Sequence, residues 1–146
     1  MRHGIDTDFL VAVEITDHPF HKGANQLLDS LLEEGHNFAL APQTLLEFIH
    51  VVTDPNRMPD PLTMREAIGK AKDWWEAKEV LRVFPKDGCV GNFLDWMNQF
   101  RLGRKRLLDT MLAATLKEAG VAKILSNNAI DYKVFELFEI LRFHGD

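Results

Sequence analysis

The sequence predicts an α/β fold in which a central parallel sheet of about five short strands carries helices on both faces. Short apolar runs of strand length alternate along the chain with longer segments whose apolar residues recur at helical spacing. Such alternation is typical of strand–helix–strand units, which build parallel sheets through right-handed crossovers. The 146 residues contain no internal repeat and no domain boundary, so we expect a single domain over residues 1–146.

The first half of the chain is expected to hold two strands and four helices. We place the strands at residues 2–6 and 38–41, and the helices at residues 9–15, 17–34, 42–53 and 63–77. Asp17 can cap the second helix, Gly35 ends it, and Pro42 opens the third, since proline is tolerated in a first helical turn. Three prolines within residues 53–61 predict a loop, because the residue before a proline is barred from helix.

The second half is expected to complete the sheet. We place strands at residues 80–84, 123–125 and 137–141, and helices at residues 88–102 and 107–119. Gly120 ends the longer apolar helix. A turn of helix precedes the final strand.

Composition limits the environment of the protein. The single cysteine, Cys89, excludes an internal disulfide framework and a cysteine-based zinc site, and suits a reducing compartment. We find neither a signal-peptide pattern nor an apolar run of about 18 residues, so we expect a cytoplasmic protein that does not span a membrane. The net charge of −5 argues against binding nucleic acid by bulk attraction alone. However, four acids gathered at a metal ion would leave 18 acidic residues against 17 Lys and Arg.

Four acidic positions lie where strands end or on the helices that follow. Asp6 closes the first strand, which is where ligand sites form in open α/β sheets. Glu47 lies on a narrow polar stripe of its helix. Asp109 lies on a helix that is apolar around most of its circumference, where a lone carboxylate is costly unless it is paired or metal-bound. Beyond the strand at 123–125, Asn128 and Asp131 both offer oxygen ligands.

Structural roles compete with this interpretation. A solvated helix face would explain Glu47, and Asp109 could act as a cap. Asp8, which directly precedes an apolar run, suits a cap better than Asp6 does. If the acids instead converge, oxygen ligands without Cys or clustered His favour Mg²⁺, with Mn²⁺ as a substitute. Such an ion activates water and stabilises a phosphoryl group under in-line attack.

Taken together, these residues resemble the PIN domain, a family of small metal-dependent ribonucleases that includes the VapC-type toxins of prokaryotic toxin–antitoxin pairs. The resemblance spans the chain and rests on residues 4–7, 42–47, 108–115 and 125–132. It implies a PIN-like fold in which Asp6, Glu47 and Asp109 are catalytic and hold Mg²⁺ or Mn²⁺. Asp131 is the expected fourth catalytic and metal-binding acid, and Asn128 is its competitor for that position.

Other positions match the family pattern less closely. Thr7 is expected to hydrogen-bond within the site, as the matching residue of the family does. Ser126 stands where the family usually has Thr, so a hydroxyl is kept. Asp8 stands where the family usually has Asn or Ser. Its extra charge could tighten cation binding or repel the RNA phosphate.

The resemblance implies an endoribonuclease that hydrolyses RNA phosphodiester bonds, as the toxin of a type II, VapBC-like pair. A small VapB-like antitoxin and a homodimer are the protein partners it implies. We expect RNA phosphates to meet a basic run, although a solvated turn would also explain it. This run holds Arg101, Arg104, Lys105 and Arg106.

Three alternatives remain from the sequence. One is a stand-alone PIN nuclease without an antitoxin, and another is a protein-binding module without catalysis. The third is a haloacid dehalogenase-like phosphatase, since Asp6 and Asp8 match its opening motif. That class needs a later lysine and a late acidic pair at strand ends, whereas Lys123 precedes its strand and Asn127 and Asn128 follow it.

Overall fold

The computed structural model describes residues 1–145 and contains a five-stranded sheet in which each pairing is parallel. The strands are β1 (Arg2–Ile5), β2 (Asn37–Leu40), β3 (Val80–Arg82), β4 (Lys123–Leu125) and β5 (Glu139–Leu141). The helices are α1 (Thr7–Glu14), α2 (His21–Glu33), α3 (Pro42–Val52), α4 (Met64–Glu76), α5 (Asp87–Gln99), α6 (Leu107–Glu118) and α7 (Ala129–Lys133), with a 3-10 helix η1 at Arg104–Arg106. The predicted α/β class with a parallel sheet is confirmed.

The strand order β3-β2-β1-β4-β5 places β1 at the centre. The chain builds outward from β1 to β2 and β3, and then returns to the other side of β1 to add β4 and β5. In register, Gly4 of β1 pairs with Ala39 of β2 and with Ile124 of β4. The order therefore reverses between β1 and β4, and ligand sites of open α/β sheets form at the carboxyl ends of strands at such a point.

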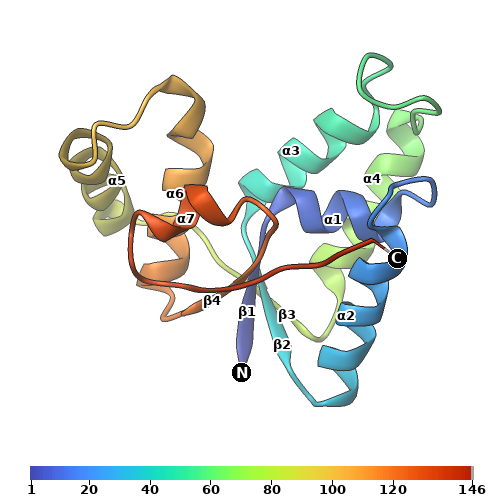
Figure 1. Ribbon diagram of the computed structural model, residues 1–146, viewed down its shortest axis with the longest axis horizontal. Helices are drawn as coiled ribbons and strands as arrows, with labels where there is room; N and C mark the ends of the chain where they lie inside the picture. Colours follow the sequence, from blue (N-terminus) through green and yellow to red (C-terminus); the bar gives the residue numbers. More distant parts are fainter. Residues whose placement is uncertain (146) are drawn as a thin grey trace.

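Helices cover both faces of the sheet, and side chains alternate between two apolar cores along each strand. Phe38 and Leu40 of β2 join the core that packs against α1 and α2, whereas Ala39 joins the core against α6. Figure 1 shows this division, with α1 to α4 on one side of the strands and α5 to α7 on the other. The C-terminal segment crosses toward α1, where Phe143 packs edge-on against Phe9.

Close contact between α6 and β1 depends on Gly4. A Cβ atom at this position would lie 2.5 Å from Cδ1 of Leu116, closer than carbon atoms can approach. The absence of a side chain lets α6 lie directly on the central strand. This contact sets the height of α6 relative to the end of β1, and therefore the place of Asp109 relative to Asp6.

The start of the second helix differs from the sequence prediction. The helix begins at His21, and its N-cap residue Phe20 makes no side-chain cap, so the prediction that Asp17 caps it is wrong. The backbone N–H of His18 bonds to the carbonyl of Ile15, and that of His21 bonds to the carbonyl of His18. Residues 15–20 thus form the turn that reverses the chain between α1 and α2.

Other boundaries shift by one to three residues. Two of the three strands after α4 are shorter than predicted, since β3 ends at Arg82 and β5 begins at Glu139, whereas β4 has its predicted bounds. Thr63 lies outside α4 as its N-cap and forms a capping box with Glu66. Within the described residues, no helix has both the length and the apolar character needed to span a membrane.

Candidate active site

Asp6 directly follows β1 and is held at the carboxyl edge of the sheet by two neighbours. Its Oδ1 accepts a hydrogen bond from the backbone N–H of Thr7 at 2.8 Å. Its Oδ2 accepts one from the hydroxyl of Ser126, the first residue after β4, at 2.7 Å. The side chain is 4% exposed. Burial raises the pKa of Asp6 and the charge of Glu47 adds to the rise, while the hydrogen bonds from Ser126 and Thr7 oppose it.

Asp6 is also the N-cap of α1, so the prediction that Asp8 caps this helix is wrong. The helix begins at Thr7, because the extended backbone of Asp6 (φ −87°, ψ 158°) lets its carboxylate accept the first free N–H. Asp8 lies in the first turn, where its Oδ2 accepts a hydrogen bond from the backbone N–H of Asn127 at 2.8 Å. Burial, followed by the charge of Asp6, raises the pKa of Asp8 to about 8. Asp8 thus ties α1 to the loop after β4.

Glu47 reaches the same edge of the sheet from α3. Its Oε2 accepts a hydrogen bond from the hydroxyl of Thr7 at 3.0 Å. One turn earlier, the hydroxyl of Thr44 lies 3.5 Å from the carbonyl oxygen of Ile5, which docks the start of α3 against β1. Thr7 therefore contacts two acids, Asp6 through its backbone and Glu47 through its side chain, as the expectation of a hydrogen-bonding threonine requires.

Asp109 faces these acids from the first turn of α6. Burial, together with the charges of Asp6, Asp131 and Glu47, raises the pKa of Asp109 to about 7. Asp131, on the short helix α7, is 31% exposed and completes the group on the solvent side. The structure thus places the four predicted acids at the same edge of the sheet, on separate elements, where Asp6, Glu47 and Asp131 act on Asp109 through their charges.

The four basic residues predicted to meet RNA divide into two groups. Arg101, Arg104 and Lys105 are exposed on the segment that precedes α6. Arg106 instead turns toward the acids: its Nε lies 3.5 Å from Oδ1 of Asp131 and 4.0 Å from Oδ2 of Asp109. A terminal amino group of Arg106 also donates to the backbone carbonyl of Asp131.

Residues after β4 support the site; Ser126 and Asn128 were expected there from the sequence, whereas the role of Asn127 was missed. The backbone N–H of Asn128 donates to the hydroxyl of Ser126 at 3.0 Å, which orients that hydroxyl toward Asp6. The side-chain amide of Asn127 bonds to both the N–H and the carbonyl of Phe143, anchoring the loop to the C-terminal segment.

Tyr132 was also missed as part of the site. Its ring is fully buried, and its hydroxyl lies near the carboxylate of Asp6 without a hydrogen bond of ordinary geometry among the described residues. Burial, followed by the charges of Asp6 and Asp109, raises the pKa of Tyr132 well above its usual value. The available signal was the tyrosine that directly follows Asp131, since a buried tyrosine hydroxyl usually seeks a polar neighbour.

The donor atoms gathered at this edge suit a hard divalent cation. They are carboxylate oxygens, and Oδ1 of Asp8 is a buried acceptor that no described group satisfies. Within residues 1–145, no group of three or more His, Cys, Asp and Glu side chains is already arranged to hold a metal ion. Mg²⁺ keeps several of its waters and binds proteins through only one or two carboxylates. The residues present therefore fit such an ion by their chemistry.

The phosphatase alternative lacks its lysine at this site. Lys123 lies at the start of β4, at the opposite end of the strand from Ser126, and its Nζ pairs with Glu139 at 3.4 Å. A lysine held there cannot reach the acids that follow β1.

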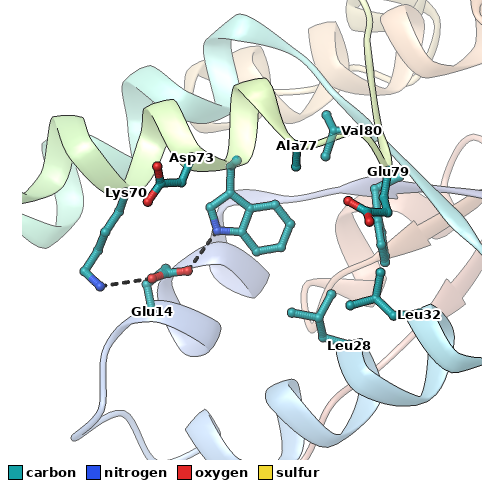
Figure 2. Close-up of a pocket in the computed structure, with 10 residues that line it drawn as sticks. Glu14, Leu28, Leu32, Lys70, Asp73, Ala77, Glu79 and Val80 are labelled. Atoms are coloured by element: carbon teal, nitrogen blue, oxygen red, sulfur yellow. Dashed lines mark hydrogen bonds and ion pairs between the residues drawn. The ribbon is translucent and has the colours of Figure 1, made fainter.

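A separate pocket of about 270 Å³ lies between α2 and α4, near the amino ends of β2 and β3. Figure 2 shows Leu28 and Leu32 on one wall and Lys70 reaching toward Glu14. The carboxylate of Glu14 is already satisfied by Lys70 at 3.1 Å and by the indole N–H of Trp74 at 2.9 Å. This pocket contains none of the four predicted acids, so we place the candidate active site at the acidic edge.

Comparison with known proteins adds independent observations. Residues 5–134 match the family model described as the PIN domain, and no curated protein matches the chain. The Mycobacterium tuberculosis toxin VapC20, which cleaves the sarcin-ricin loop, has a solved structure with 14% identity and a TM-score of 0.67, covering 85% of this chain and 87% of its own. VapBC2 from Rickettsia felis, solved with a promoter DNA fragment, has 16% identity and a TM-score of 0.68, covering 98% and 99%. VapBC-1 from nontypeable Haemophilus influenzae has 10% identity and a TM-score of 0.68, covering 97% and 98%.

Proposed function

This chain belongs to the PIN domain family, and from that membership we propose that it is a metal-dependent endoribonuclease that acts as the toxin of a VapBC-like toxin–antitoxin pair. The site residues, the metal and the RNA substrate are parts of this proposal. The similar structures of VapC and VapBC proteins support it through their shared fold.

The observation that carries the proposal is the gathering of acids at the carboxyl edge of the sheet. Asp6, Glu47, Asp109 and Asp131 come from four separate elements. Like charges held together in a partly buried site repel one another, and a protein retains such an arrangement most readily when a cation offsets it. We propose that these four residues hold Mg²⁺, or Mn²⁺ in its place, some of them directly and the others through its bound waters.

Each side chain has a definable part in the proposed chemistry. A divalent cation held here supplies Lewis-acid stabilisation of the charge that develops on the phosphoryl oxygens while water attacks in line. Asp6 is kept in place by hydrogen bonds from Thr7 and Ser126, so its orientation costs nothing further when the substrate arrives. Thr7 also fixes Glu47.

The remaining predicted residues take supporting roles. Asp8 and Asn128 hold the loop after β4 against α1 and Ser126. We propose that the exposed residues Arg101, Arg104 and Lys105 position the RNA backbone through its phosphates, which places the scissile bond over the acids. By family resemblance, the products carry a 5′-phosphate and a 3′-hydroxyl.

The proposed protein partners are a small VapB-like antitoxin and a second copy of this chain. Support for the antitoxin comes from the similar structures of VapBC proteins and of a toxin–antitoxin complex from Klebsiella pneumoniae. A short open reading frame beside this one would supply the candidate. Its product should co-purify with this chain and suppress RNA cleavage, whereas a stand-alone nuclease would be active from the same locus without a partner.

The direct test is RNA cleavage by the wild-type protein and by Asp6→Asn, each with Mg²⁺, Mn²⁺ or EDTA. We expect cleavage by the wild type with either metal, and none in EDTA or with the variant. Asp95→Asn is the matched control, because it removes the same charge from an exposed position on α5. Equal cleavage under all conditions would mean a contaminating nuclease or another mechanism.

A further inference from the structure

Arg106 is a half-buried cation inside the acidic site. Its side chain is 20% exposed, although it follows the exposed pair Arg104 and Lys105 on η1. The guanidinium lies between Asp131 on α7 and Asp109 on α6, with its Nε 3.5 Å and 4.0 Å from their carboxylate oxygens. Arg106 therefore links two of the acids that the proposed function assigns to a divalent cation.

The guanidinium of Arg106 pairs only loosely with the carboxylates of Asp109 and Asp131. Charge-assisted hydrogen bonds between nitrogen and a carboxylate are about 2.7–2.9 Å long, whereas both distances from Nε exceed this range. Nε is buried and makes no hydrogen bond within the described part of the chain. The guanidinium is anchored instead at the backbone carbonyl of Asp131. The carboxylate oxygens of Asp109 and Asp131 thus keep lone pairs for another cation.

The backbone of Arg106 is held more firmly than its guanidinium group. The hydroxyl of Thr110 donates to its carbonyl at 2.6 Å, and its own N–H bonds to the carbonyl of Gly103 at 2.9 Å. From this fixed backbone the side chain projects toward α7, where it donates to the carbonyl of Asp131. Two acids besides Asp131, namely Asp6 and Glu47, act on Asp109 through their charges, and Arg106 supplies a positive charge against them.

We propose that Arg106 is the resident counterion of the acidic site: it holds Asp109 and Asp131 together without a metal ion and competes with a divalent cation for their oxygens. This inference rests on the proposed function, because it assumes that the acids bind such a cation. Once one cation neutralises these carboxylates, a second cation is attracted to them less strongly, and the two cations repel each other. Arg106 accordingly weakens cation binding and stabilises the cation-free protein.

The test is Mn²⁺ binding by isothermal titration calorimetry to the full, metal-stripped chain. We expect Arg106→Gln to bind Mn²⁺ at least fivefold more tightly than the wild type, and Arg106→Lys, which keeps the charge, to stay within about twofold of it. Arg65→Gln is the matched control, since it removes an exposed charge on α4 and should leave the affinity unchanged. Equal or weaker binding by Arg106→Gln would overturn the inference.

A second measurement follows Mg²⁺ binding in the wild-type protein and needs a variant only to assign the signal. In the wild-type protein, the ¹⁵Nε–H NMR signal of Arg106, assigned by its absence from Arg106→Lys, should shift as Mg²⁺ is added. A signal that stays in place while Mg²⁺ binds would contradict competition and leave the proposed function intact. If neither the wild type nor the Arg65→Gln control binds Mn²⁺ or Mg²⁺, the proposed function and this inference fail together.

Discussion

Lowering the pH should stabilise the metal-free protein, because two acids of the site titrate near neutrality. The pKa is raised to about 7 for Asp109 and to about 8 for Asp8, chiefly by burial. A carboxylate with a raised pKa binds its proton more tightly in the folded chain than in the unfolded one. Stability is therefore greatest when these groups are protonated, and it is lost as the pH rises toward 7 to 8.

The size of the effect follows from the shift. For Asp109, a rise from 3.8 to about 7 corresponds to about 4 kcal/mol of destabilisation at high pH, at ~1.4 kcal/mol per pKa unit. Moving from pH 8 to pH 6 recovers roughly 1.4 kcal/mol of this from Asp109 alone. In a chain of this length that gain raises Tm by roughly 3–6 °C. His3 opposes it, because burial lowers the pKa of His3 to about 4 and protonation then favours the unfolded chain.

Comparing the wild type with Asp109→Asn isolates the contribution of Asp109 to the pH dependence of stability. Tm is measured in EDTA at pH 8 and pH 6 for the wild type and for Asp109→Asn, which carry the same His3. The wild type should gain several degrees more than the variant on acidification, and saturating Mn²⁺ should remove the difference because metal ligation requires ionised carboxylates. Equal pH dependence of the two proteins in EDTA would refute the placement of Asp109 among the buried acids.

Three further substitutions test the packing and the hydrogen bonds around the site. Gly4→Ala should cost about 1–3 kcal/mol in denaturant unfolding, because its Cβ would meet Leu116 at 2.5 Å. Thr7→Val should reduce RNA cleavage at least about tenfold, since it removes the hydroxyl that holds Glu47. Thr7→Ser should retain most of the activity, and equal loss in both would contradict that role. Thr63→Ala should lower stability by about 1 kcal/mol and leave cleavage unchanged, because it removes only a helix cap.

The sheet and the acids were predictable because both follow from local pattern. Strands end where apolar runs meet polar residues, and parallel strands bring those ends to one edge. Asp6 could therefore be placed without coordinates. Which of Asp6 and Asp8 caps the helix could not be predicted from the sequence. It depends on whether the helix begins after residue 6 or two residues later, and the sequence allows both.

The sequence could not predict that Arg106 turns toward the acids while its neighbours stay exposed. It lies in the same basic run as Arg104 and Lys105, so nothing local distinguishes it. Its direction is set by the docking of α7 against α6, which is a contact between distant segments. The second helix illustrates the same limit: Asp17 looks like a cap, but residues 15–20 are needed for the turn that packs α2 against α1.

The measurement that tests the central claim most directly is Mn²⁺-dependent RNA cleavage by Asp109→Asn, measured beside the wild type and Asp95→Asn. If this acidic site both binds the cation and cleaves RNA, the rate of RNA cleavage should fall at least about a hundredfold in Asp109→Asn. It should not change in the exposed control Asp95→Asn. Cleavage by Asp109→Asn at the wild-type rate would contradict the assignment of this site.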